Sequence, residues 1–277
     1  MGLFGIHKNK KGSQPQHNKT VSPPERLLSY QFANIQGIGN RNRQEDSFTQ
    51  MNVLDVKKIK QEGILFTVCD GMGGMADGRV ASETAIESIR ASFSEIDRGG
   101  NIADQLVDAV YEAGNAVYRK LNGDGGTTMI ACIIYEEQFY YASVGDSYLY
   151  LYRNGQLTRL NEMHNVCHSL YKDEIMSGGF DPFKGRNDIE SEALTQFLGM
   201  EELGDVDYFR KPLAIHSGDI FLVCSDGIGG VIEPRILMNC LSMSTPAEMC
   251  REMEQEIHVI NKPNQDNYTG VILKCLY

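Results

Sequence analysis

The chain is 277 residues long, 42% hydrophobic, and carries a formal net charge of −11 at pH 7. This length fits one large domain or two small ones, and the middle of the chain has no stretch of linker composition. The acidic balance argues against nucleic acid as the main partner, because phosphate backbones are bound by an excess of lysine and arginine. The sequence also lacks a long uncharged apolar run, which excludes a membrane-spanning helix.

The cysteines favour a reducing compartment. Seven are present, with no C-x-x-C pair, and Cys69, Cys132 and Cys224 lie in apolar runs where a thiol packs as a small hydrophobe. This usage does not fit a secreted disulfide scaffold. We therefore expect a soluble, cytoplasmic protein that does not bind membranes.

The N-terminal segment differs from the rest of the chain. Residues 1–25 are polar, contain Lys8, Lys10 and Lys11, and show no apolar period. We interpret this segment as a flexible basic tail. Residues 26–277 are expected to form a single domain.

The first half of this domain predicts strands followed by two helices. Strand-like runs occupy 29–35, 46–53 and 64–69, with a turn at Gly37, Gly39 and Asn40 between the first two. Apolar stripes at helical spacing follow, one with Ala81, Ala85, Ile89 and Phe93, the other with Leu106, Val110, Ala113, Val117 and Leu121.

The second half predicts a meander and then mixed elements. Strands are expected at 127–135, 138–144 and 148–152, with a hairpin turn at Arg153-Asn154-Gly155-Gln156 leading to 157–160. Residues 161–203 have no clear period and resemble a mobile insertion. A strand at 219–224, helices around 235–241 and 246–260, and a strand at 268–275 complete the chain. The pattern predicts a mostly antiparallel α+β layered fold.

Five short acidic motifs stand where hydrophobic runs meet turn residues. They are Gln44-Glu45-Asp46, Asp70-Gly71-Met72-Gly73-Gly74, Gly145-Asp146-Ser147, Ser225-Asp226-Gly227 and Asn264-Gln265-Asp266-Asn267. Each acid alone is explained as a strand or turn cap. Together they predict one shared metal site, because neighbouring carboxylates repel by roughly 4 kcal/mol at about 4 Å and need cations to remain ionised. Oxygen ligands of this kind select Mg²⁺ or Mn²⁺.

The glycine-rich motif has a competing interpretation. Gly71 to Ala76 matches G-x-G-x-x-A between a strand and a helix, as in dinucleotide-binding proteins. However, Asp70 would direct a carboxylate at the pyrophosphate, and a second helix follows where a strand is required. The chain has no Gly-Lys-Ser/Thr for a P-loop. We favour an approach of the Gly71 backbone to a metal.

In this order the motifs resemble the metal-dependent protein Ser/Thr phosphatases of the protein phosphatase 2C type. The resemblance runs from about Tyr30 to Leu273 and also includes Arg41, Gly78, Gly126-Thr127-Thr128 and Ser143-Val144. It implies two antiparallel β-sheets in a central sandwich flanked by helices, in α-β-β-α layers, with a binuclear Mn²⁺ or Mg²⁺ centre at one edge. It also implies that residues 161–203 are the family's flap.

The resemblance assigns a role to each candidate site residue. Asp70 would bridge both metals and Gly71 would contribute its carbonyl; Asp226 and Asp266 would hold one ion, and Glu45 and Asp46 would act at the second. Asp146, with Asp226, would hold a third, weaker ion. Arg41 falls at the phosphate-binding arginine, and its planar fork can grip two phosphate oxygens.

Three departures from the family pattern bear on function. Gln44 stands where many members have asparagine. Met72 replaces the histidine assigned in many eukaryotic members as the leaving-group acid; methionine has no proton to donate, so a metal-bound water would have to serve. The residues that precede His164 also differ from the family's usual Asp-His-Ser motif. We interpret His164 as a solvent-facing loop residue.

We therefore predict a bacterial-type phosphatase that hydrolyses phosphoserine and phosphothreonine in proteins with a metal-activated water. A phosphorylated protein would be its substrate and a Ser/Thr kinase its opponent, and we expect a monomer. One alternative is a catalytically weak pseudophosphatase acting as a sensor or scaffold, which would not need every acidic position. A second alternative is a stress-regulator phosphatase that applies the same chemistry to an anti-anti-sigma-like protein. An appended sensor domain would favour this alternative, and none is visible in the sequence.

Overall fold

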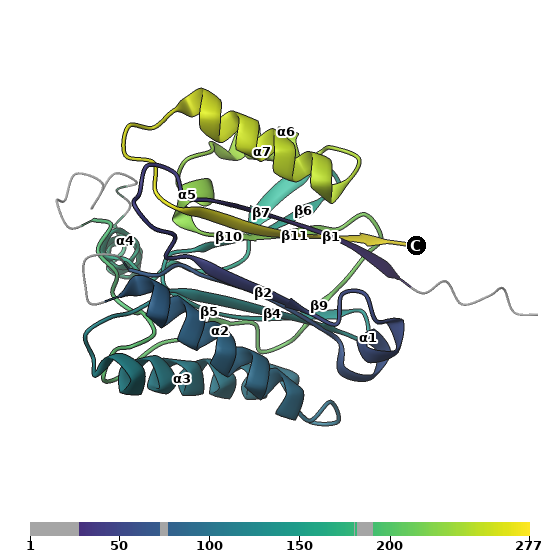
Figure 1. The fold of residues 1–277 in the computed structure, drawn as a ribbon, viewed down its shortest axis with the longest axis horizontal. Coiled ribbons are helices and arrows are strands. Elements are labelled where there is room, and N and C mark those ends of the chain that lie inside the picture. Colours follow the sequence, from purple (N-terminus) through teal and green to yellow (C-terminus); the bar gives the residue numbers. More distant parts are fainter. Residues whose placement is uncertain (1–27, 73–76, 180, 182–190) are drawn as a thin grey trace, which may run out of the picture.

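Two antiparallel β-sheets pack face to face, and a layer of helices covers each outer face (Figure 1). The computed structural model describes residues 28–72, 77–179, 181 and 191–277. The predicted tail at 1–25 and residues 73–76 of the glycine motif lie outside the described residues, as do 180 and 182–190 of the predicted flap.

The first sheet has the strand order β1-β11-β10-β6-β7. Its members are β1 (Ser29–Gly37), β11 (Tyr268–Leu276), β10 (Ile220–Cys224), β6 (Tyr148–Arg153) and β7 (Gln156–Arg159). The second sheet has the order β2-β3-β4-β5-β8, and β9 also pairs with β5. It contains β2 (Ser47–Met51), β3 (Ile64–Cys69), β4 (Met129–Tyr135), β5 (Gln138–Val144), β8 (Asp207–Tyr208) and β9 (Leu213–Ala214).

Amphipathic helices close the two outer faces. The second sheet is covered by α2 (Gly78–Glu95) and α3 (Ile102–Leu121), whose apolar stripes pack on it around Leu65 and Ala131. The first sheet is covered by α6 (Pro234–Leu241) and α7 (Pro246–Ile260). Between the sheets, stacked Phe139 and Phe221 rings lie 4.1 Å apart at the centre of a third cluster. The predicted α+β sandwich is therefore confirmed.

Two predicted connections are different in the structure. The turn at Gly37 to Asn40 does not join paired strands, because β1 pairs with β11 and β2 with β3. The meander also breaks at Gly145-Asp146-Ser147, where the chain leaves β5 in one sheet and enters β6 in the other. Period-two patterns do not reveal which sheet a strand joins, so the sequence could not show either crossing.

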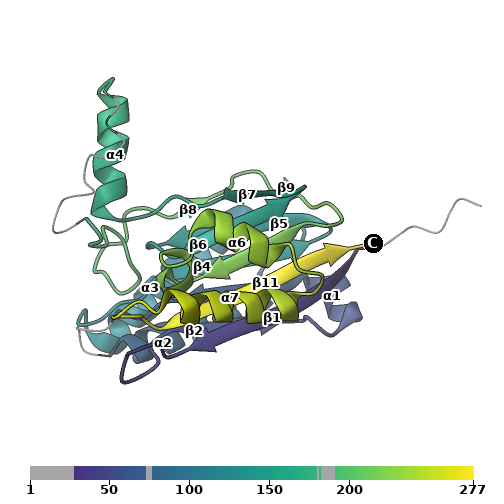
Figure 2. The ribbon, with the colours of Figure 1, turned by 90° about the horizontal axis from the view of Figure 1, so that it is seen from above.

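Helices without a buried face were not predicted. Helix α1 (Val56–Glu62) and helix α4 (Val166–Met176) have no buried residues, so neither shows an apolar stripe. Helix α1 is marked only by its caps, Asp55 and Gly63. Helix α4 lies within the predicted flap and projects from the body of the molecule (Figure 2). The single turn α5 (Asp226–Gly229) follows β10.

Two further features agree with the composition. All seven cysteines are free thiols, and Cys69, Cys132 and Cys224 are buried as predicted. Among the described residues, no helix combines the length and apolar character that crossing a bilayer requires.

Candidate active site

The predicted ligand residues lie at one end of the sandwich, where strands of both sheets terminate. Asp70 follows β3 of one sheet, whereas Asp226 follows β10 and Asp266 precedes β11 of the other. The antiparallel register of β2 with β3 and of β10 with β11 places these termini at the same end. Asp146 occupies the crossing between the sheets. Segments far apart in the sequence thus meet here.

A pocket of about 430 Å³ opens at this end. Every predicted site residue lines it except Asp46, which is buried. The lining consists of Arg41, Glu45, Asp70, Gly71, Met72, Thr128, Asp146, Glu192, Leu194, Phe197, Asp226 and Asp266. Within the described residues, no group of three or more His, Cys, Asp or Glu side chains has the arrangement of a formed metal site.

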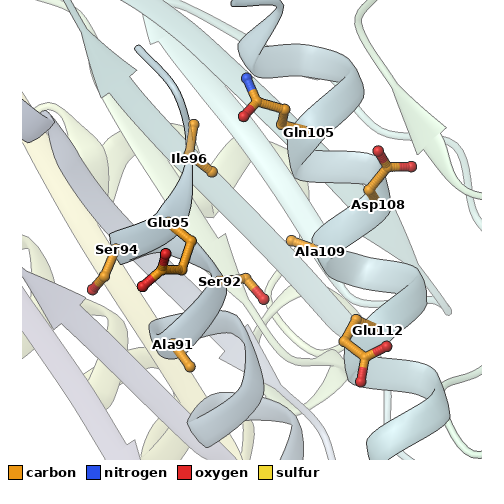
Figure 3. A pocket seen from close by; sticks show the side chains of 9 residues that line it. All are labelled: Ala91, Ser92, Ser94, Glu95, Ile96, Gln105, Asp108, Ala109 and Glu112. Atoms are coloured by element: carbon orange, nitrogen blue, oxygen red, sulfur yellow. The ribbon is translucent and has the colours of Figure 1, made fainter.

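A larger groove lies elsewhere and lacks converging polar groups. It measures about 590 Å³ and runs between α2 and α3, bordered by Glu95, Asp108 and Glu112 (Figure 3). In Figure 3 these three carboxylates are spread along the groove and do not point toward one another. The smaller carboxylate pocket is therefore the candidate active site.

Asp70 is the central member of a group of three carboxyl side chains at the pocket. Asp70 lies within hydrogen-bonding reach of both Asp46 and Asp226. Burial, followed by the negative charges of Asp46 and Asp226, holds the pKa of Asp70 well above its usual range. Burial also raises the pKa of Asp46 and of Asp226. Such a group needs either shared protons or cations.

The chemistry of these groups fits bound cations. The Oδ1 atoms of Asp46 and Asp226 are buried and accept no hydrogen bond within the described part of the chain. Leaving a buried carboxylate oxygen without a partner is costly, and a cation removes that cost. All the candidate donors are oxygens, which suits hard ions such as Mg²⁺ and Mn²⁺.

The backbone of Asp70 is held from both sides. Thr128 Oγ1 accepts a hydrogen bond from Asp70 N at 3.0 Å, and Thr127 Oγ1 donates to Asp70 O at 2.8 Å. Gly71 is required here by a close approach, since a Cβ at this position would overlap the backbone of Gly78 and Glu45. The glycine thus permits the strand, the α2 N-terminus and the Glu45 loop to meet.

His164 is buried, and its interpretation as a solvent-facing residue was wrong. The residue is 7% exposed, and its Nδ1 accepts a hydrogen bond from Gly145 N at 3.2 Å. The backbone N–H of His164 donates to Gly145 O at 3.0 Å. Gly145 has φ +100°, a conformation that favours glycine. His164 therefore supports the crossing that carries Asp146.

Polar side chains also fix the loop that carries Glu45 and Asp46. Gln44 Oε1 accepts from Asp46 N at 2.9 Å, and Asn267 Oδ1 accepts from Glu45 N at 2.8 Å. Ser225 Oγ donates to Asp46 Oδ2 at 2.9 Å. Gln44, Asn267 and Ser225 therefore position the Glu45–Asp46 loop. The residue types in the sequence did not reveal this role.

The comparisons with known proteins agree with this arrangement. The family model described as Protein phosphatase 2C matches residues 30–170, which is more than half of the chain. The chain belongs to the protein phosphatase 2C family. This confirms the predicted family and, at the level of the family, the prediction of a protein Ser/Thr phosphatase.

Bacterial relatives are similar over much of the chain. The serine/threonine phosphatase stp of Listeria monocytogenes is 32% identical over 174 residues, covering 60% of this chain and 66% of the relative. The serine/threonine protein phosphatase PstP of Mycobacterium tuberculosis is 27% identical over 214 residues, covering 75% of this chain and 40% of the relative.

Solved structures share the fold. The phosphatase MsPP from Mycobacterium smegmatis, in complex with cacodylate, has a TM-score of 0.68 at 27% identity, covering 90% of this chain and 98% of that one. The catalytic domain of PstP, in complex with two manganese ions, has a TM-score of 0.71 at 22% identity, covering 91% and 100%.

Proposed function

We propose that this chain hydrolyses phosphoserine and phosphothreonine in proteins with the aid of two Mn²⁺ or Mg²⁺ ions. The observation that carries the proposal is the meeting of carboxylates from both sheets, with buried unpartnered oxygens on Asp46 and Asp226, beside a pocket that contains Arg41. The manganese-bound PstP structure supports the choice of metal.

The proposed ligand assignment is the one that the family resemblance implies, and the meeting of these residues at one pocket supports it. Asp70, at the centre of the carboxyl cluster, would contact both ions, and the Gly71 carbonyl would join it. Asp226 and Asp266 would hold one ion, and Glu45 and Asp46 the other. Asp146, whose pKa is raised to about 7 by burial and then by Asp226, would hold a weaker third ion with Asp226.

The residues of this chain then bind and orient the phosphate. When bound, the two cations supply Lewis-acid chemistry that makes water more acidic and offsets charge on the phosphoryl group. Arg41 is the one cationic side chain among the described residues that line the pocket, so it is placed to receive phosphoryl oxygens. Met72 lines the same pocket and has no proton to give, so we propose that water protonates the leaving oxygen.

We propose a cytoplasmic enzyme, active as a monomer, that takes a phosphorylated protein as substrate in signalling and opposes a Ser/Thr kinase. The phosphatase names of the Listeria and Mycobacterium relatives support a phosphorylated protein as substrate.

Hydrolysis of a phosphothreonine peptide with added Mn²⁺ tests the proposal. Turnover should disappear with a chelator and in Asp70→Asn. Absence of turnover in the unmodified protein, with Mn²⁺ binding still measured by calorimetry, would contradict the proposal and favour the pseudophosphatase alternative.

A further inference from the structure

Three residues that follow the projecting α4 region share the pocket with the carboxylates. They are Glu192, Leu194 and Phe197, and together we call them the selector wall. A phosphate group and its metals have no need of apolar neighbours. The apolar members of the wall are therefore available to another part of a substrate.

Backbone hydrogen bonds fix the position of the selector wall. Thr195 N donates to His164 O at 2.9 Å, and Val166 N donates to Ala193 O at 3.0 Å. Leu198 and Thr127 exchange two backbone hydrogen bonds, of 2.9 and 3.0 Å. Because Thr127 also holds the carbonyl of Asp70, the wall has a set position relative to the reaction centre.

The apolar part of the wall is continuous with Met72. The Phe197 ring and the Met72 methyl group both lie against Gly126, where a Cβ would overlap each of them. Leu194 is half-buried and lines the same pocket. Removing apolar surface from water favours binding of a ligand that covers it. This part of the wall fits an apolar side chain beside the phosphorylated residue.

Glu192 gives the wall a negative charge. Its side chain is exposed, and its charge contributes, after burial and Asp226, to the raised pKa of Asp146. Of the six carboxylates that line the pocket, Glu192 is the one to which the proposed ions give no ligand role, and Arg41 is already paired with Asp266. The residual negative field attracts a cationic group.

We propose that Glu192, Leu194 and Phe197 select phosphopeptides in which a basic residue and an apolar residue flank the phosphorylated one. The basic side chain pairs with Glu192, and the apolar one packs on Leu194 and Phe197. This inference rests on the proposed phosphatase function and names the class of substrate that the site takes.

The test compares kcat/KM for three phosphothreonine peptides in Mn²⁺. The first carries one arginine and one leucine on each side of the phosphothreonine. The second has glutamate in place of each arginine, and the third has serine in place of each leucine. The unmodified protein should prefer the first peptide over the second by about tenfold. Glu192→Gln should remove most of this preference, and Leu194→Ala should reduce the preference over the third peptide. Ratios between peptides cancel any general loss of turnover.

Matched controls separate the possible outcomes. Glu202→Gln removes the same charge from an exposed residue outside the pocket and should leave the ratios unchanged. An unchanged ratio in Glu192→Gln would overturn the inference, and so would a loss of Mn²⁺ affinity in that variant, which would make Glu192 a metal residue. If no peptide is hydrolysed by the unmodified protein, the phosphatase proposal fails as well.

Discussion

Arg41 and Asp266 form an ion pair at the carboxylate pocket, with Nη2 donating to Oδ2 at 2.5 Å. Both side chains are partly exposed, at 54% and 38%. The pair joins the candidate phosphate-binding residue to a candidate metal ligand. The two proposed roles therefore compete for one contact.

Arg41→Ala should separate phosphate binding from metal binding. The variant loses the guanidinium fork, so we expect the inhibition constant for inorganic phosphate to rise by about tenfold. Mn²⁺ affinity should be unchanged or slightly higher, because Asp266 is released from its ion pair. Phosphate inhibition and calorimetric Mn²⁺ titration measure the two effects. Arg43→Ala, an exposed neighbour that does not line the pocket, is the control. An equal loss of Mn²⁺ affinity would show that Arg41 is structural.

Asp70→Asn should inactivate the protein but stabilise its metal-free form. Activity should fall by at least the roughly 100-fold that loss of a metal's outer partners costs. The melting temperature in chelator should rise, because the amide removes repulsion from Asp46 and Asp226 and avoids burying a charge. Asp108→Asn on the α3 surface should change neither quantity. Near-normal turnover in Asp70→Asn would be incompatible with the site.

The metal-free protein should lose stability as the pH rises from about 4 to about 7. Burial, with Asp226 second, raises the pKa of Asp146 from 3.8 to about 7. In that window the folded state holds a proton that the unfolded state has released, so raising the pH favours unfolding. Asp70, Asp46 and Asp226 contribute with the same sign. Thermal melts in chelator across this range measure the effect.

Two controls accompany the melts. Asp146→Asn should flatten part of the dependence, because the amide does not titrate. Saturating Mn²⁺ should reverse it, since cations bind deprotonated carboxylates more tightly at higher pH. Metal-free stability that increases steadily over the window would contradict the raised pKa values.

His164→Leu should destabilise the protein by about 1–3 kcal/mol, because Gly145 N–H is left buried without an acceptor. His164→Asn offers an acceptor oxygen near the Nδ1 position and should recover part of that loss. Urea unfolding measures the free energies, with His258→Leu on the exposed end of α7 as the control. Equal stability of His164→Leu and His164→Asn would exclude the proposed hydrogen-bond role.

Helices and strands could be predicted where their buried residues form a recognisable apolar pattern in the sequence. The continuous apolar runs of β3 and β10, each followed by an aspartate, predicted both the strands and the metal-site hypothesis. Helices α2, α3, α6 and α7 each bury one face and were also predicted. Helices α1 and α4 bury no residue, so no period was available.

Contacts between distant segments could not be predicted in the same way. The burial of His164 depends on Gly145, and the position of Glu192 depends on the backbone pairing of its neighbours with α4 and Thr127. Neither residue lies in a periodic segment. Resemblance to the family supplied the candidate ligands, but it did not supply the hydrogen bonds of Gln44, Asn267 and Ser225 that position them.

The crossing of the chain between the two sheets at Gly145-Asp146-Ser147 has a mechanical consequence. The candidate ligand Asp70 follows a strand of one sheet, whereas Asp226 and Asp266 flank strands of the other. Sliding of one sheet over the other would change the separations between these carboxylates. Ions held by both sheets would therefore resist shear in the sandwich, and substitutions at the Phe139–Phe221 contact, remote from the pocket, would be felt as altered metal affinity.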